Sequence, residues 1–433
     1  MFGSWIRRTA FKTLDLVKGG KVQKHYKDIA EKMEQGKSVE PALAHMLEYA
    51  VKNVPYYQGK DYKELKDFPV IDKKEIMANY EAFRSVEYMD TSRLHEVATS
   101  GSSGNPFHAF QNADKRNRVV AELMYVHNRI GWKVGDRYVF MRAWTGHYNN
   151  MSFQQFKQNF IAVEVTGFDK PHMDSIRALL KKDKKIEVII GYSSSLAELA
   201  QYMLDEGDNS DMFNIRVIVA DSDMLTQTGK KNLEKVFGCP VISRYDNEEQ
   251  GILAYTEAYS DEYILNSASY YVEILSMDGD YPAQPGEAGR IVVTDMYNKA
   301  MGFIRYDTGD LAIAGQRDGD RCLTIKSLQG RTADIVTATD GTSVNSASIN
   351  NYICDFYDVK KYQLIQKAQG EFELLLVCDE NSESVKKIDE NMRKLLGADV
   401  NLTIKVLEDI PYGKNGKYKT VVNLCDAPAK VEA

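Results

Sequence analysis

The chain has 433 residues, which exceeds the usual size of a single hydrophobic core and predicts one large domain with a smaller one, or three modest domains. Hydrophobic residues make up 43% and charged residues 27%, as in soluble globular proteins, and a net charge of -7 argues against a nucleic-acid partner. Five cysteines without CxxC spacing indicate neither a disulfide framework nor a zinc knuckle, and they favour a reducing cytoplasm.

The N-terminal segment, up to about residue 20, mixes apolar residues with Arg7, Arg8, Lys12 and Lys18. It lacks an unbroken apolar run of about 18 residues, so it predicts neither a membrane-spanning helix nor a cleaved signal. An amphipathic helix packed on the body is the favoured interpretation, and weak contact with a membrane surface is the alternative. Oligomerisation is left open.

Residues 20–95 have the apolar spacing of helices, with a break at Pro55, and residues 1–95 are predicted to form the helical N-terminal region of the large domain. From about residue 95 to 325, short β-branched runs alternate with helical stretches. The clearest predicted strands are 138–141, 188–190, 217–219 and 240–242. This alternation predicts an α/β fold with a partly parallel sheet.

Between residues 262 and 330 the strands follow one another closely, for example at 271–275 and 289–294, which predicts a β-rich subdomain. A strand at 372–377, a polar helix at about 382–397 and a strand at 402–406 then predict a small α+β domain. The expected domains are therefore 1–95, an α/β core at 96–329 with a β-rich end, and a mobile C-terminal domain at 330–433.

A loop of alternating hydroxyls and glycines directly follows the strand-like stretch near residue 95. Glycines let the backbone approach a ligand closely, while hydroxyls and backbone N–H groups can converge on an anion. The loop therefore predicts a phosphate-binding site, and a flexible polar surface loop is the alternative. The candidate binding residues are Thr99, Ser100, Gly101, Ser102, Ser103 and Gly104.

Three later segments add candidate groups. In Tyr306-Asp307-Thr308-Gly309-Asp310, a turn glycine precedes a carboxylate, that of Asp310, which could accept two hydrogen bonds from a ribose diol. Gly330-Arg331 stands at the predicted domain boundary. Near the end, Lys417 lies on a glycine-flanked loop, where a point charge could reach a carboxylate and a phosphate together.

These four segments occur in the order and roughly the spacing of the adenylate-forming superfamily, which the chain resembles over about residues 45–425. Segments such as Val54-Pro55-Tyr56-Tyr57 and Ile304 to Asp310 are similar to the phenylacetate-coenzyme A ligase branch and its CapK-like relatives of capsular polysaccharide biosynthesis. In that branch the phosphate loop lacks the lysine that other members place after its proline. Phe107 fills the place here.

The superfamily's central Tyr-Gly-x-Ser/Thr-Glu motif corresponds best to residues 245–249. The resemblance implies that Tyr245 stacks on adenine and that Glu249 binds magnesium, although a shift of one residue would make Glu248 the ligand. Asp246 replaces the motif's glycine and could restrict the pocket. Asp223 lies where an acidic residue often lines the adenine side, and Ala333 replaces a charged hinge residue.

The resemblance implies ATP-dependent activation of a carboxylic acid as an acyl-adenylate, followed by transfer to a thiol such as coenzyme A. In that scheme Lys417 and Glu249 are catalytic, Glu249 holds magnesium, and the 99–104 loop, Tyr245, Asp310 and Arg331 bind the nucleotide. Two alternatives stay open. One is adenylyl or acyl transfer to a coenzyme or cell-surface saccharide precursor, and the other is a nucleotide-binding protein with reduced or lost turnover, prompted by Asp246 and Ala333.

The acid itself is not identified by the sequence. Candidate contacts are His95, His108, His127, His147, Trp144, Tyr148 and Tyr192, although structural roles are more common for such residues.

Overall fold

The computed structural model describes residues 2–98, 107–144, 151–166, 168–331, 334–353, 356, 358–411 and 419–425. The described helices are α1 (Phe2–Val17), α2 (Lys21–Gln35), α3 (Glu40–Asn53), α4 (Lys73–Ala78), α5 (Tyr80–Phe83), α6 (Ala113–Arg129), α7 (Met151–Gln158), α8 (Lys170–Lys182), α9 (Ser193–Asp205), α10 (Gln227–Phe237), α11 (Ser346–Asn351) and α12 (Glu383–Leu396). Short 3₁₀ turns lie at Pro55–Tyr57, Leu65–Asp67, Val86–Tyr88, Thr91–Arg93 and Ser210–Met212. Within these ranges, none of the helices has both the length and the apolar character that crossing a bilayer requires.

One large sheet runs through the body in the order β10-β11-β12-β15-β9-β8-β7-β6-β5-β3-β4. Its strands are β3 (Arg137–Arg142), β4 (Phe160–Glu164), β5 (Ile186–Tyr192), β6 (Val217–Asp221), β7 (Val241–Asn247), β8 (Gly251–Thr256), β9 (Tyr263–Leu265), β10 (Tyr270–Leu275), β11 (Ala288–Asp295), β12 (Tyr306–Ala314) and β15 (Thr324–Arg331). Strands β3 to β7 pair in parallel, and β7 to β12 with β15 pair antiparallel.

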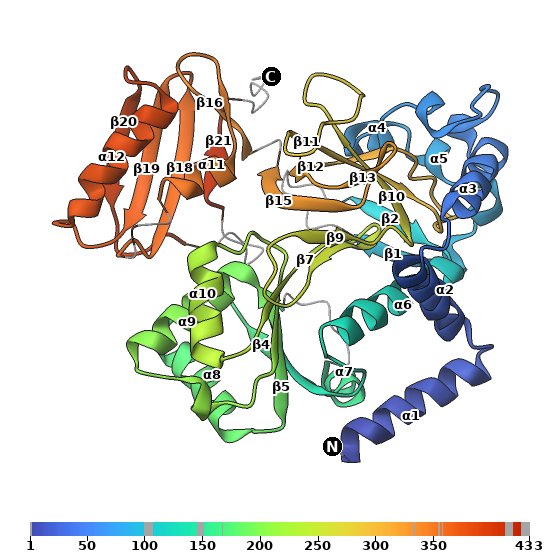
Figure 1. Ribbon diagram of the computed structural model, residues 1–433, viewed down its shortest axis with the longest axis horizontal. Coiled ribbons are helices and arrows are strands. Elements are labelled where there is room, and N and C mark those ends of the chain that lie inside the picture. The colour runs from blue at the N-terminus through green and yellow to red at the C-terminus, as the bar shows by residue number, and fades with distance from the viewer. Residues whose placement is uncertain are drawn as a thin grey trace.

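The parallel half has the near-continuous apolar runs of strands covered on both faces. All five residues of β6 are buried, and Ile218 lies in a core shared with α8, α9 and α10 through Ile176, Leu196 and Leu233. Figure 1 shows these helices, in green, stacked together beside this part of the sheet. The predicted βα alternation is therefore confirmed, because buried parallel strands need helical crossovers.

The antiparallel half continues the same sheet, because β7 pairs with β6 on one edge and with β8 on the other. A separate core lies where the N-terminal helices meet this half, with Met46, Tyr57 and Phe83 packed near Phe303 and Tyr306. The N-terminal helices α3 to α5 therefore cover the antiparallel half, as the blue segments of Figure 1 show.

The C-terminal domain has a four-stranded sheet in the order β20-β19-β18-β21, formed by β18 (Lys361–Ala368), β19 (Glu371–Val377), β20 (Asn401–Val406) and β21 (Val421–Asn423). Leu374 on β19 packs against Ile388 and Met392 of α12. The remaining strands form two-stranded sheets: β1 (His95–Ala98) with β2 (His108–Gln111), β13 (Arg317–Asp318) with β14 (Arg321–Cys322), and β16 (Val336–Thr337) with β17 (Ser343–Val344).

The α/β fold class with a separate C-terminal α+β domain is confirmed. The limits 1–95, 96–329 and 330–433 stay a prediction.

A buried ionic network links α6 to the antiparallel half of the sheet. The side chains of Lys115 and Asp295 are fully buried, with Lys115 Nζ 2.8 Å from Asp295 Oδ2. Lys115 also donates to the Tyr270 hydroxyl (2.9 Å), which donates to the carbonyl oxygen of Gln250 (2.7 Å). Burial raises the pKa of the neighbouring Glu122 carboxyl, and Lys115 opposes that rise. The network therefore fixes the backbone beside Glu249.

Candidate active site

Three of the predicted site residues contact one another, although they lie far apart in the sequence. Tyr245 on β7 donates through its hydroxyl to Asp310 Oδ2 on β12 (2.8 Å), and Arg331 Nε on β15 lies 3.2 Å from Asp310 Oδ1. Asp310 and Arg331 are direct partners in the antiparallel pairing of β12 and β15. The sheet register therefore brings the predicted ribose-binding carboxylate and the predicted hinge arginine together.

The Asp310 side chain is mostly buried, at 17% exposure, whereas the Arg331 side chain is 56% exposed. Burial raises the pKa of the Asp310 carboxyl, while Arg331 and the Tyr245 hydroxyl favour its charged form. Burial also holds the pKa of Tyr245 well above its usual range, so this tyrosine stays a hydrogen-bond donor. Both Asp310 oxygens are thus held in place.

Glu249 lies in the turn between β7 and β8 and is 6% exposed. The turn is fixed by Asn247 Oδ1, which accepts from the Gln250 amide (2.8 Å), and by Gln111 Nε2, which donates to the Glu249 carbonyl oxygen (3.2 Å). The Tyr306 hydroxyl donates to Glu249 Oε1 (2.9 Å), whereas Oε2 is buried without a partner among the described residues. Burial raises the pKa of this carboxyl.

These surroundings fit a magnesium ligand. Mg²⁺ is commonly held by one or two carboxylates together with substrate phosphates rather than by a complete protein cage. The buried and unpartnered Glu249 Oε2 supplies such a carboxylate oxygen, and no cluster of three or more His, Cys, Asp or Glu ligands occurs in the described ranges. Glu248, the alternative ligand, is exposed. The residues present therefore fit a magnesium ion, and Glu249 as its ligand stays a prediction.

The predicted phosphate loop and the predicted lysine lie outside the described residues. This applies to Thr99, Ser100, Gly101, Ser102, Ser103, Gly104 and Lys417, and also to Ala333. The strands that flank the loop are described: β1 and β2 pair antiparallel, with Ala98 opposite His108. The loop sequence therefore connects two strands of a hairpin.

One cation near the site was missed in the sequence. Lys73, the first residue of α4, places Nζ 5.4 Å from the ring centroid of Phe107, which fills the place where other members of the superfamily that the sequence resembles have a lysine. Lys73 also lowers the pKa of the Glu249 carboxyl, against the larger effect of burial. No sequence signal marked Lys73, because a lysine at the start of a short helix is usually only solvated.

Asp246 belongs to a charged cluster with two neighbours. Arg244 Nη2 donates to Asp221 Oδ2 (2.7 Å), and Arg244 Nε lies 2.9 Å from Asp246 Oδ2. Successive side chains of a strand alternate between its faces, so Arg244 and Asp246 share one face of β7 and Tyr245 lies on the other. Asp246 is thus paired with Arg244 on the face of β7 opposite to Tyr245.

We expect this cluster to make the stability of the protein depend on pH. Burial, together with Asp246 and Asp223, raises the pKa of Asp221 to about 7 against the effect of Arg244. Because the pKa of Asp221 is higher in the folded protein than its unfolded value of 3.8, Asp221 contributes stability that is fully present below pH 3.8. This contribution is lost as the pH rises through about 7. We expect Asp221→Asn to flatten this loss, measured as the change in urea midpoint between about pH 5 and about pH 8. An unchanged slope would contradict the assignment.

The other candidate residues have structural contacts. His127 is half-buried and stacks on Trp132 at 3.8 Å, and Asp223 accepts from the Ser194 amide at the start of α9 (3.3 Å). Trp144 Nε1 donates to the Val163 carbonyl oxygen (3.0 Å), and Tyr192 is buried in the core around β5. His108 and His95 lie on the β1–β2 hairpin, both exposed, whereas His147 and Tyr148 lie outside the described residues.

The chain is similar in sequence to CapK proteins. Residues 336–424 match the family model of the CapK C-terminal domain. Protein CapK from Staphylococcus aureus is 23% identical over 386 residues, which cover 83% of this chain and 80% of that protein.

Among solved structures, 2-hydroxyisobutyryl-CoA ligase in complex with an adenylate has a TM-score of 0.69 at 15% identity, covering 88% of each chain. ATP-bound MatB from Rhodopseudomonas palustris has a TM-score of 0.54 at 16% identity, covering 74% of this chain and 65% of that one. The chain is therefore a homologue of CapK, with a CapK C-terminal domain and the fold of the adenylate-forming ligases.

Proposed function

We propose that this protein is an adenylate-forming ligase of the carboxylate-CoA ligase type. It activates a carboxylic acid with ATP and magnesium and then transfers the acyl group to a thiol such as coenzyme A. Solved proteins of the same fold support this proposal: 2-hydroxyisobutyryl-CoA ligase is seen with an adenylate and CoA, and the anthranilate-CoA ligase AuaEII with anthranoyl-AMP.

The observation that carries the proposal is the convergence of Tyr245, Asp310 and Arg331 near a buried carboxylate with an unpartnered oxygen, that of Glu249. Strand β12 carries both Tyr306, whose hydroxyl donates to Glu249 Oε1, and Asp310, and strand β7, which carries Tyr245, leads into the Glu249 turn, so one extended ligand could reach both carboxylates. Such a ligand would carry a hydroxylated sugar near Asp310 and a phosphate–metal unit near Glu249. ATP has both parts in one molecule.

In the first half-reaction a substrate carboxylate oxygen attacks the α-phosphorus of ATP. An O–P bond forms, the bond to the leaving oxygen breaks, and pyrophosphate departs. Asp310 accepts hydrogen bonds from the ribose hydroxyls, and Arg331 lies on the ribose–phosphate side. Residues 99–104 hold the β- and γ-phosphates, Lys417 spans the carboxylate and the α-phosphate, and Lys73 adds a cation close to Glu249. Magnesium, when bound, neutralises phosphate charge beside Glu249.

In the second half-reaction a thiolate attacks the acyl carbonyl carbon and AMP leaves. We propose that the C-terminal domain rotates about residues 331–334 between the two steps, withdrawing Lys417 and admitting the thiol. The exposure of the Arg331 side chain supports this rotation. Arg331 pairs with Asp310 from the solvent-exposed side, so the pair can separate without disrupting a hydrophobic core.

Three measurements test the proposal. A thermal-shift screen of carboxylic acids with ATP and magnesium should raise the melting midpoint for a true substrate, because ligands that bind the native state stabilise it. Pyrophosphate release with the best acid then separates a ligase from a protein that only binds nucleotide. AMP release that requires coenzyme A separates thiol transfer from transfer to a coenzyme or saccharide precursor. Nucleotide binding without pyrophosphate release for any acid would overturn the proposal.

Asp310→Asn should weaken ATP binding by about 1 to 3 kcal/mol, because it removes the charge from the hydrogen bonds to the ribose. The measurement is calorimetry with ATP. Asp318→Asn is the matched control, since Asp318 is 69% exposed on the short β13–β14 hairpin and its loss should leave ATP affinity unchanged. Equal affinity in wild type and Asp310→Asn would assign Asp310 to a purely structural turn.

A further inference from the structure

Helix α1 packs on the body through a mostly polar side that also carries Phe11. Arg8 donates to the Val134 carbonyl oxygen (3.2 Å) and pairs with Asp136 (3.2 Å), and Arg7 donates to the Phe156 carbonyl oxygen of α7 (3.3 Å). Asp15 accepts from the first amides of α2, at Val22 and Gln23. The amphipathic helix packed on the body that the sequence predicts is confirmed, and its packing side combines these polar side chains with Phe11.

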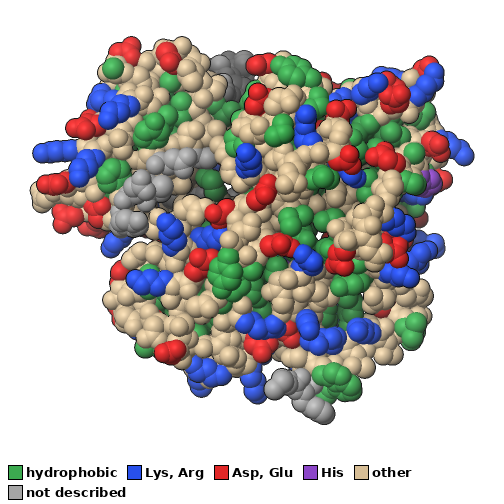
Figure 2. Space-filling view, in the orientation of Figure 1, with side chains coloured by type: hydrophobic (Ala, Val, Ile, Leu, Met, Phe, Trp, Pro, Cys, Tyr) green, Lys and Arg blue, Asp and Glu red, His purple; other side chains and the backbone are tan. Residues whose placement is uncertain are grey.

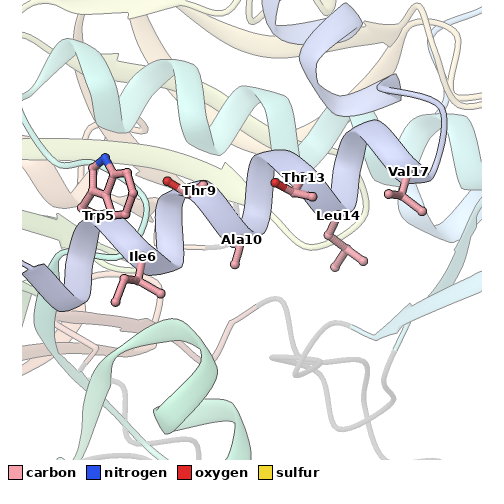
Figure 3. A pocket seen from close by; sticks show the side chains of 7 residues that line it. All are labelled: Trp5, Ile6, Thr9, Ala10, Thr13, Leu14 and Val17. Atoms are coloured by element: carbon pink, nitrogen blue, oxygen red, sulfur yellow. The ribbon is translucent and has the colours of Figure 1, made fainter.

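The apolar side of α1 faces solvent instead. Trp5 is 60% exposed, Leu16 74% and Val17 78%, and Ile6 and Leu14 are also exposed. A shallow groove along the helix is lined by Trp5, Ile6, Leu14 and Val17 together with Ala10 and two threonines. Figure 3 shows Ile6, Ala10 and Leu14 projecting from the same side, as their spacing of four residues requires. An exposed stripe of this kind, rimmed by polar groups, marks an interaction surface.

Basic side chains surround this apolar side. Lys12 lies on α1 beside the stripe, Lys18 follows the helix, and Lys157 lies on the adjoining α7, all exposed. Exposed Phe153 and Phe156 of α7 extend the apolar area next to the start of α1. Figure 2 shows green apolar and blue basic side chains together along the lower edge of the molecule, where α1 lies. This local charge is opposite in sign to the net charge of -7 of the chain.

We propose that α1 docks this protein on an anionic lipid surface, lying in the plane of the headgroups with Trp5, Leu14 and Val17 inserted. Apolar residues on one face with lysines at its border are the features of helices that bind membrane interfaces without crossing them. Anionic headgroups would neutralise Lys12 and Lys18. Association of two copies of this chain through α1 would instead place two positively charged helices next to each other. Their mutual repulsion opposes such a dimer.

Vesicle sedimentation tests the proposal on the full chain, with vesicles of phosphatidylcholine alone and of phosphatidylcholine mixed with phosphatidylglycerol. We expect binding to the anionic vesicles that weakens with salt. Leu16→Glu/Val17→Glu should abolish it, and Lys12→Glu should weaken it roughly fivefold or more, as expected from the loss of each charge near an anionic surface. The fluorescence of Trp5 should shift to the blue on binding, and Trp5→Phe should remove the shift.

Matched controls come from other exposed positions. Val86→Glu/Met89→Glu adds the same two charges at apolar side chains that are 52% and 48% exposed, and Lys387→Glu reverses an exposed lysine of α12. Both should bind like wild type, and all variants should keep the wild-type melting temperature because the side chains are exposed. Binding to neutral vesicles as strong as to anionic vesicles would overturn the proposal. It would also be overturned if the protein bound no vesicles and instead formed a dimer that Leu16→Glu/Val17→Glu dissociates.

Discussion

Glu249→Gln is expected to reduce carboxylate-dependent exchange of pyrophosphate into ATP by about two to three orders of magnitude, the scale seen when a preorganised group that stabilises developing charge is removed. Glutamine keeps the size of the side chain and an oxygen that can accept from the Tyr306 hydroxyl, so the turn should fold normally. The amide lacks the negative charge of the buried Oε2, which has no other partner among the described residues. Calorimetry should therefore also show weaker binding of ATP in the presence of magnesium.

Two companion variants make this result specific. Glu248→Gln removes the adjacent, exposed carboxylate, and it should leave exchange nearly unchanged. If Glu248→Gln lost exchange activity and Glu249→Gln kept it, the metal ligand would be Glu248 instead of Glu249. Lys417→Ala should abolish exchange while ATP binding largely survives, because this lysine is proposed to act on the reacting carboxylate and α-phosphate. Undiminished exchange in Lys417→Ala would refute that role.

Lys115→Met is expected to destabilise the protein by about 3 to 5 kcal/mol, because it leaves Asp295 as an uncompensated buried charge. Both side chains are fully buried, and Lys115 also bonds to the Tyr270 hydroxyl. Urea unfolding followed by tryptophan fluorescence measures the change in the large N-terminal region, since Trp5, Trp132 and Trp144 all precede residue 330. Tyr270 would lose its donor, so the Gln250 turn beside Glu249 should also loosen.

The double variant Lys115→Met/Asp295→Asn should recover much of the lost stability, because no buried charge then remains in the pair. The matched surface control is Lys37→Met, which breaks an exposed pair with Glu31 at 2.7 Å and should cost less than about 1 kcal/mol. A loss in Lys115→Met no larger than that of Lys37→Met would show that the buried pair contributes little to stability.

Apolar patterning predicted several elements of this fold. The strands at 188–190 and 217–219 are recognisable in the sequence as continuous apolar runs. These runs exist because both faces of the parallel half of the sheet are buried. The helix at 382–397 was predicted within one residue of each end of α12, because one stripe of it, including Ile388 and Met392, is buried. What periodicity could not reveal is that β7 joins the parallel and antiparallel halves into one sheet, since strand order depends on contacts between distant segments.

The sequence by itself determined the fold class and the order of the motifs, because glycine turns and apolar runs act over a few residues. Only the tertiary structure placed Tyr245, Asp310 and Arg331 in contact, since sheet register sets distances between strands. It also decided which side of α1 faces solvent. An amphipathic helix has two usable faces, and here the one that packs carries Arg8, which pairs with Asp136, together with Phe11.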